Sequence, residues 1–209
     1  MTARLAFALP GTWLAIDPGD EAASFDRVDA AVRDVVGTAD DAATTRRRLR
    51  DQLRAVVAAA RTSGAQGVFL CREVAPGVPL PATLTVHAPS AMTMTPAIGT
   101  APDAVLDTLH HSLQTLAAAG ADTAVRVPAP DGGALRIHRR IDEQLETAAA
   151  EPPVQRLEAD YWYPVPGSKR VVLASFATPL GHLHDAMLNL FDSIAAAARF
   201  ESAATGLAP

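Results

Sequence analysis

The chain has 209 residues, of which 49% are hydrophobic and 20% are charged, and its net charge is −5 at pH 7. This length and composition exclude an intrinsically disordered chain and suffice for one domain with its own core. The acidic balance provides no basic surface, so we expect no nucleic-acid partner. No run of about eighteen apolar residues occurs, and no secretory cleavage pattern follows the first apolar stretch. We therefore predict a cytoplasmic protein without membrane insertion.

The first predicted elements are a strand and two helices. Residues 4–9 alternate weakly between apolar and polar side chains and end at Pro10-Gly11, which is typical of a strand followed by a turn. Apolar residues then recur at helical spacing and predict helices over residues 24–36, with Ser24 as the N-cap, and over residues 41–62. We expect each helix to bury one apolar stripe.

A hairpin is predicted after the second helix. Residues 66–74 and 80–88 read as strands, and Ala75-Pro76-Gly77 between them has turn chemistry. We therefore expect the two strands to pair antiparallel. Residues 89–101 contain two prolines and show no clear hydrophobic period, which predicts a loop.

Two further helices and four further strands are predicted in the second half of the chain. Pro102 at the first helical position and Gly120 beyond the last one indicate a helix over residues 103–119. Thr178-Pro179 indicates the start of a last helix over residues 180–199. The strands form two hairpins with tight turns and cover residues 123–128, 134–141, 155–165 and 170–177.

The order of these elements predicts the fold class. Strands joined mainly by tight hairpins, with helices inserted between the hairpins, indicate an α+β fold with a mainly antiparallel sheet of about six or seven strands packed with helices. We expect a single domain over residues 1–200 and a disordered tail over residues 201–209. The apolar stripes predict buried side chains at Trp13, Leu53, Leu113, Phe176, Leu190 and Ile194.

Segments at the two ends of the chain carry a family resemblance. The start Phe7–Trp13 and the ending Val172–Pro179 with Phe191–Ala195 resemble the Mog1/PsbP-like superfamily, above all its actinobacterial LpqN-type members. The resemblance implies an αβα sandwich and a non-catalytic binding or accessory role. The signal sequence and lipidation cysteine of the lipoprotein members are not found here, so their envelope location is not expected.

The usual motifs of catalysis are absent from the sequence. It contains no Gly-x-Ser-x-Gly nucleophile elbow and no phosphate-binding glycine loop. Cys71, the only cysteine, lies within a predicted strand, where a buried inert thiol is expected. On a helix, His182 and His184 diverge, as do His110 and His111, so neither pair converges on one metal ion. We expect no enzyme, no cofactor and no metal site.

Three predicted strands carry rows of polar side chains. Alternate residues of a strand share a face, so each row lies on one face of its own strand. If the basic and acidic rows are neighbours, they form ion pairs across the sheet, whereas a partly uncovered sheet face would instead offer a binding groove. The rows are Arg136, His138 and Arg140; Glu158 and Asp160; and Thr83, Thr85 and His87.

The second predicted helix carries an arginine stripe, because Arg47, Arg50, Arg54 and Arg61 fall within a narrow arc at the helical period. A solvated face is the commonest explanation of such a stripe. Guanidinium groups also suit interfaces because they are weakly hydrated, so the stripe is a candidate surface for an acidic partner protein.

These features lead to two predictions of function. The first is a non-catalytic accessory or adaptor protein that recognises another protein, one with an acidic surface, through its own surface. The alternative is a carrier of a small hydrophobic or anionic ligand held between the sheet and the loop over residues 89–101, with Thr93, Met94 and Thr95 as an adaptable lid. A closed cavity of ligand size would favour the carrier, and a filled core with a grooved exterior would favour the adaptor.

Overall fold

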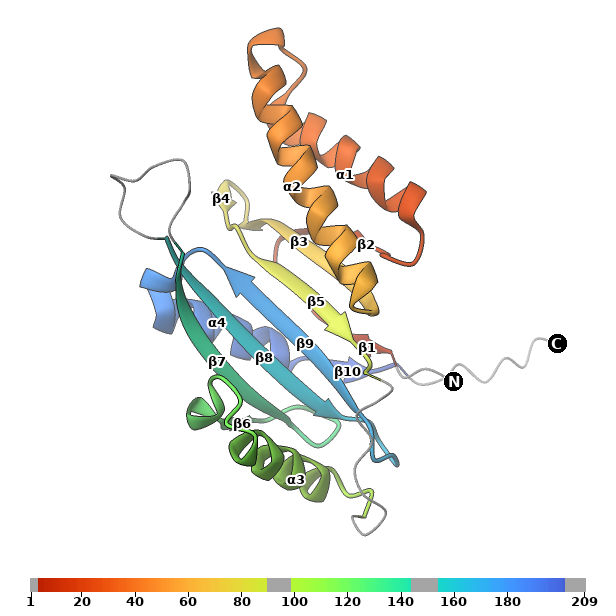
Figure 1. The fold of residues 1–209 in the computed structure, drawn as a ribbon, viewed down its shortest axis with the longest axis vertical. Helices are drawn as coiled ribbons and strands as arrows, with labels where there is room; N and C mark the ends of the chain where they lie inside the picture. The colour runs from red at the N-terminus through yellow and green to blue at the C-terminus, as the bar shows by residue number, and fades with distance from the viewer. Residues whose placement is uncertain (1–3, 90–98, 144–153, 202–209) are drawn as a thin grey trace, which may run out of the picture.

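The computed structural model describes residues 4–89, 99–143 and 154–201. Most of the expected loop over residues 89–101, including its lid residues, lies outside these ranges, as does all of the expected tail except residue 201. Within them, a large antiparallel sheet is covered by helices on both faces (Figure 1). The predicted α+β class is therefore confirmed.

In the part of the chain that the structure describes, the main sheet has eight strands, and all of their pairings are antiparallel. The strands are β2 (Thr12–Ile16), β3 (Ala65–Ala75), β4 (Val78–Pro79), β5 (Thr83–His87), β6 (Val125–Val127), β7 (Ala134–Glu143), β8 (Val154–Pro164) and β9 (Val171–Thr178). Seven of them lie side by side in the order β2-β3-β5-β9-β8-β7-β6, and β4 pairs with β3. A separate small sheet pairs β1 (Leu5–Ala6) with β10 (Arg199–Phe200).

The helices divide between the two faces of the main sheet. The pair α1 (Glu21–Val36) and α2 (Ala43–Thr62) covers the β2 end of one face, and α3 (Pro102–Thr115) covers the other end of that face. The opposite face is covered by α4 (His184–Ala196), which Figure 1 shows behind the sheet. The molecule is thus built of three layers, helix, sheet and helix.

The helices enclose three apolar cores in the described part of the chain. Under α4, the buried rings of Phe176 and Phe191 stack at 4.7 Å between centroids. Under α1 and α2, Val32 packs with Val68, and under α3 the core is built around Trp162. The last two cores share one face of the sheet but do not merge. The middle of that face, between α2 and α3, is therefore covered by neither of these two cores.

The N-terminal strand and the hairpin differ from the prediction because of prolines and glycines. Within the expected strand over residues 4–9 only β1 (Leu5–Ala6) forms, and β2 (Thr12–Ile16), which the sequence analysis does not predict, follows the turn at Pro10-Gly11. Gly11 has a φ of 78°, and a Cβ there would lie 2.0 Å from the carbonyl oxygen of Glu73. The expected strand over residues 80–88 begins only at Thr83, since Pro81 has no N–H to donate to a ladder.

The first helix begins earlier than predicted, at Glu21, because Asp20 and not Ser24 is its N-cap. The carboxylate of Asp20 accepts a hydrogen bond from the Ala23 N–H at 3.0 Å. Ser24 is buried one turn further on, where its hydroxyl donates to the carbonyl of Asp17.

The last two helices are shorter than predicted. α3 ends at Thr115, before a left-handed residue, Ala117, whose φ is 50°. Leu116 consequently lies beyond the helix and is 77% exposed. α4 begins only at His184, because a 3₁₀ turn over Gly181–Leu183 comes first. These ends depend on backbone conformations that hydrophobic spacing does not report.

Two of the six side chains predicted to be buried are buried, namely Phe176 and Ile194. The other four are only partly buried: Trp13, Leu53, Leu113 and Leu190. Trp13 lies on an edge strand and uses its indole N–H to bond the Pro10 carbonyl at 2.8 Å. In α4 the residue that points most directly into the core is Phe191, the neighbour of Leu190.

Candidate functional site

The register of the sheet separates the basic row from the acidic row. Arg136 lies opposite Tyr161, and Ile137 lies opposite Asp160. Directly opposed residues share a face, so Arg136, His138 and Arg140 point to the α4 face, whereas Glu158 and Asp160 point to the other face. The predicted ion pairs between these rows are therefore wrong.

On the α4 face, the basic row takes part in holding the helix. A guanidinium N–H of Arg136 bonds one carboxylate oxygen of Asp192 at 2.5 Å, and the Tyr161 hydroxyl donates to the other oxygen at 2.7 Å. The ring of His138 lies 4.9 Å from that of His184, while Arg140 is exposed. Arg136 and His138 therefore belong to the packing of α4, and the structure does not bring this row to the groove.

His138 lies among groups that disfavour its charge. Burial lowers its pKa most, positive charge on Arg136, His184 and Arg140 also lowers it, and Asp192 acts in the opposite direction. The Nδ1 atom of His138 is buried and has no hydrogen-bond partner among the described residues. The fold thus favours the neutral imidazole.

We expect protonation of His138 to destabilise the fold. The unfolded chain takes up this proton near a pKa of about 6.5, above the lowered value in the fold. Stability is therefore lost as the pH falls through about 6.5, and the loss is complete below the folded pKa. Urea unfolding between about pH 7.5 and about pH 5 should show a smaller loss for His138→Gln than for the wild type. Equal losses would contradict this assignment.

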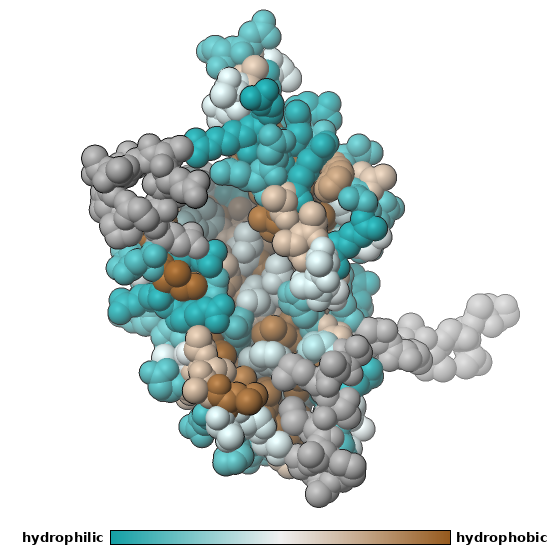
Figure 2. Space-filling view, in the orientation of Figure 1, coloured by the Kyte–Doolittle hydropathy of each residue, from teal (hydrophilic) through white to brown (hydrophobic). Residues whose placement is uncertain are grey.

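The other polar residues of the predicted groove are brought together on the face that carries α1, α2 and α3. Thr85, Ser175 and Asp160 lie side by side on three neighbouring strands and form one row across the sheet. The adjacent row on the same face consists of Thr83, Ala177 and Glu158. His87 lies in the row on the opposite side of Thr85. These residues form the floor of a cleft between α2 and α3, and Figure 2 shows the surface hollowed at this place. We call these seven residues the cleft floor.

The two carboxylates of the cleft floor differ in their partners. Glu158 accepts from Arg139 Nε at 2.6 Å and lies 2.8 Å from Arg156 Nη2. Asp160 accepts a hydrogen bond from the Ser175 hydroxyl, and no ion pair reaches it from the residues that the structure describes. Burial raises the pKa of Asp160 more than the Ser175 hydrogen bond lowers it. Glu158 thus forms salt bridges with two arginines, whereas the positive charges of Arg139 and His87 act on Asp160 without a salt bridge to it among the described residues.

An apolar groove of about 600 Å³ opens beside the cleft floor, between the α1–α2 pair and the sheet. Thr83, Ala177 and Arg156 line it as well, so the groove and the floor are continuous. At its mouth Val35 is 60% exposed and Val56 is 38% exposed. Its other apolar lining includes Leu14, Val32, Leu49, Leu53, Leu70 and Pro179. Sequence reasoning missed this groove because helical spacing assigns the same side chains to buried stripes.

A larger cavity of about 770 Å³ lies at the opposite end of α1. Its lining mixes apolar side chains with charged ones such as Asp17, Asp20 and Arg27. Arg27 is already bonded to the carbonyl of Ala15 at 2.7 Å, and Asp20 caps α1. None of the residues predicted to form a site lines this cavity.

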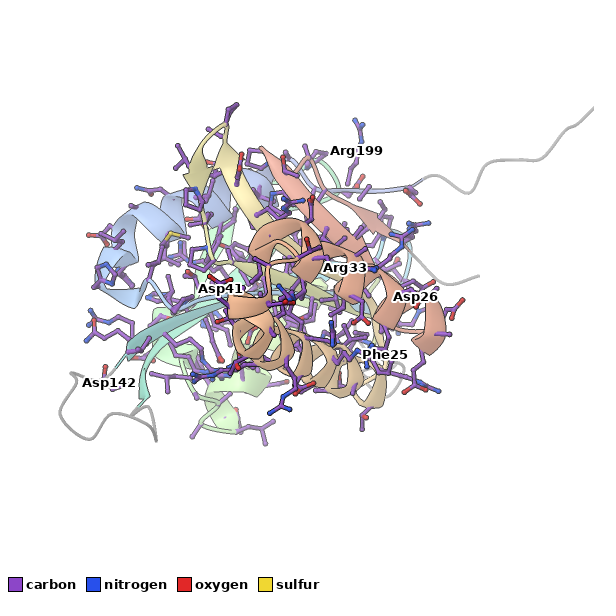
Figure 3. The ribbon with its side chains drawn as sticks, turned by 90° about the horizontal axis from the view of Figure 1, so that it is seen from above. Phe25, Asp26, Arg33, Asp41, Asp142 and Arg199 are labelled. Carbon is purple, nitrogen blue, oxygen red and sulfur yellow. The ribbon has the colours of Figure 1, made fainter. Side chains whose placement is uncertain are left out.

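The arginine stripe mainly joins the two helices of the α1–α2 pair. Arg50 and Arg54 lie 3.2 and 2.8 Å from the Asp29 carboxylate, and Arg61 pairs with Glu21. The Arg54 guanidinium also lies 4.9 Å from the ring centre of Phe25, which Figure 3 shows between the two helices. Among the described residues, Arg47 is the member of the stripe without an ion pair. Three of the four arginines expected at a docking surface are thus engaged in ion pairs within the chain, and two of these three share one carboxylate.

The remaining candidates do not converge. Over residues 4–89, 99–143 and 154–201, no three His, Cys, Asp or Glu side chains are grouped to hold a metal ion. Cys71 is partly buried, and burial raises the pKa of its thiol to about 11. No helix in the described ranges has the length and apolar character needed to cross a membrane.

The fold and the site define an α+β protein with an open apolar groove between the α1–α2 pair and its sheet. Comparison of the chain with models of protein families, with curated proteins and with solved structures finds no match.

Proposed function

We propose that the protein is a non-catalytic adaptor whose apolar groove binds an apolar segment of a partner protein. The observation that carries the proposal is the open mouth of the groove, where Val35 and Val56 are exposed above an apolar lining. Exposed apolar surface that adjoins a groove is typical of protein interaction sites, and helix-lined grooves commonly take apolar peptide anchors. The resemblance to the Mog1/PsbP-like superfamily points in the same direction.

The groove replaces the arginine stripe as the main surface of this proposal. Three of the four arginines pair with Asp29 and Glu21, so among the described residues Arg47 is the member of the stripe left without an ion pair to meet the acidic partner surface expected from the sequence. Such exposed charges steer association and add little affinity. A partner seated in the groove and reaching across α2 would contact Arg47 as a peripheral group.

A carrier of a small hydrophobic ligand is the second candidate, and the size of the groove favours it. A volume of about 600 Å³ falls within the range of small-molecule sites, roughly 300–1,000 Å³. The expected lid residues Thr93, Met94 and Thr95 lie outside the described residues. Small-molecule sites bury most of their ligand, whereas Val35 and Val56 are exposed at the mouth of this groove. The open mouth therefore makes the adaptor the better supported of the two candidates.

The test is capture from a lysate of the source organism, with protein and small-molecule fractions identified by mass spectrometry. We expect the wild type to retain a protein that the double variant Val35→Glu, Val56→Glu loses, because two carboxylates at the mouth oppose entry of an apolar segment. Titration of the purified partner by calorimetry should then show affinity reduced at least about tenfold, which corresponds to about 1.4 kcal/mol.

The matched control is Val125→Glu, which changes a valine that is 46% exposed on β6, away from the groove. It should bind the partner as the wild type does, and thermal unfolding should show that all the variants remain folded. Undiminished binding by the double variant would overturn the adaptor proposal. Recovery of a small molecule alone, released by the double variant, would replace it with the carrier.

A further inference from the structure

The carboxylates of Glu158 and Asp160 on the cleft floor differ in their hydrogen-bond and salt-bridge partners. Glu158 is neutralised by Arg139 and Arg156. Asp160, two residues along the same face of β8, has the Ser175 hydroxyl as its hydrogen-bond donor and no salt bridge within the described ranges. A carboxylate withdrawn from water without a cation beside it is costly, and a cationic ligand group relieves that cost.

The surroundings of Asp160 suit the head group of a bound cation. The hydroxyls of Thr83 and Thr85 lie on the same floor, in the rows of Glu158 and Asp160, and make no hydrogen bond within the described part of the chain. Hydroxyl oxygens accept hydrogen bonds from ammonium and guanidinium groups. Burial raises the pKa of Asp160, and the Ser175 hydrogen bond and the positive charges of Arg139 and His87 offset this only in part. A cation in direct contact with the carboxylate would offset the cost of burial further.

The distance from the groove to Asp160 suits a long basic side chain. Ala177 and Thr83 line the apolar groove, and Ser175 and Asp160 form the next row of the same face. Rows on one face are two residues apart, which is about 7 Å along a strand. A lysine or arginine stem spans such a distance over apolar surface while its head reaches a polar group.

We propose that the partner segment in the groove carries a lysine or arginine whose cation pairs with Asp160 on the cleft floor. The inference rests on the proposed function, because it names the chemistry of the segment that the groove takes. An apolar anchor would fill the space under α1 and α2, and the adjacent basic side chain would lie along Ala177 toward Asp160. Charge complementarity at one carboxylate would thus fix the direction of the segment.

The test uses three probes with one apolar tail and different heads: n-hexylammonium, 1-hexanol and hexanoate. Hexylammonium carries the ammonium group of lysine on a longer methylene chain, which supplies the apolar tail. Chemical-shift titrations on the full chain should place all three tails in the groove, with hexylammonium bound at least about tenfold more tightly than hexanol and hexanoate more weakly than both. In Asp160→Asn, hexylammonium and hexanol should bind within about twofold of each other.

Asp160→Asn is expected to fold, since burial penalises the charge that it removes, and Asp160→Ser serves as a second neutral variant. The matched control is Asp122→Asn, which neutralises an exposed carboxylate on the turn before β6. It should keep the cation preference. Equal binding of the three probes in the groove, or a preference that survives in both Asp160 variants, would overturn this inference alone. Failure of every probe to shift groove residues would overturn the proposed groove as well.

Discussion

Phe176→Ala is expected to lower the free energy of unfolding by about 3–5 kcal/mol, the cost of emptying a filled aromatic site. Phe176 has no exposed surface and forms the centre of the core under α4. Its ring stacks on Phe191 at 4.7 Å and meets Tyr161 edge-on at 5.5 Å. These partners come from β8 and α4, so a collapse that fills the space would have to move both elements. Urea unfolding followed by circular dichroism measures the loss.

The control for this prediction is Leu116→Ala. Leu116 is also a large apolar residue, but it is exposed beyond the end of α3, so its replacement should change stability by no more than about 0.5 kcal/mol. A loss below about 1 kcal/mol for Phe176→Ala would show that this core is not packed as described.

Asp192→Ala is expected to cost about 2–3 kcal/mol, because it leaves the Arg136 guanidinium nearly buried without its partner. The side chain of Arg136 is 11% exposed and that of Asp192 is 31% exposed, so water reaches the pair only from the aspartate side. For this reason the estimate lies below the cost of breaking a fully buried pair, about 3–5 kcal/mol. The Tyr161 hydroxyl, which donates to the same carboxylate, loses its acceptor in the same variant.

A double-mutant cycle separates the ion pair from the packing. Arg136→Met combined with Asp192→Ala removes both charges, so the double variant should be more stable than Asp192→Ala alone. Near-additive losses would show that Arg136 and Asp192 do not interact, and would contradict their role in holding α4 on the sheet. Surface pairs such as Arg126–Asp107, 2.5 Å apart but well exposed, should contribute less than about 1 kcal/mol.

The candidate site could be predicted from the sequence only in part. The period of two along a strand correctly places Glu158 with Asp160 on one face, and Thr83 with Thr85 and His87 on one face. It cannot report how neighbouring strands are aligned, and a shift of one residue moves a whole row to the other face. The basic row of β7 was therefore matched to the wrong partners. Its acidic partner, Asp192, lies on α4, more than fifty residues further along the chain.

The arginine stripe shows the same limit for a helix. Helical geometry correctly brings Arg50, Arg54 and Arg61 to one side of α2. The meaning of that side depends on what packs against it, and in this fold it meets the acidic side chains of Asp29 and Glu21 on α1. On an isolated helix this stripe would be a docking surface, whereas in this fold its arginines form ion pairs that connect α2 to α1.

The sequence by itself determined the α+β class, the antiparallel pairing through tight turns and the approximate positions of α1 to α4 and of the strands longer than five residues, whereas β2 was not predicted. These properties depend on local signals, namely hydrophobic period, proline and glycine placement and turn chemistry. Only the tertiary structure decided where the surface is open. The groove joins α1 and α2 to β5, β8 and β9, segments separated by up to about 150 residues, and it opens between the helix pair and the sheet. Such a gap is a property of packed elements, and no local pattern of residues encodes it.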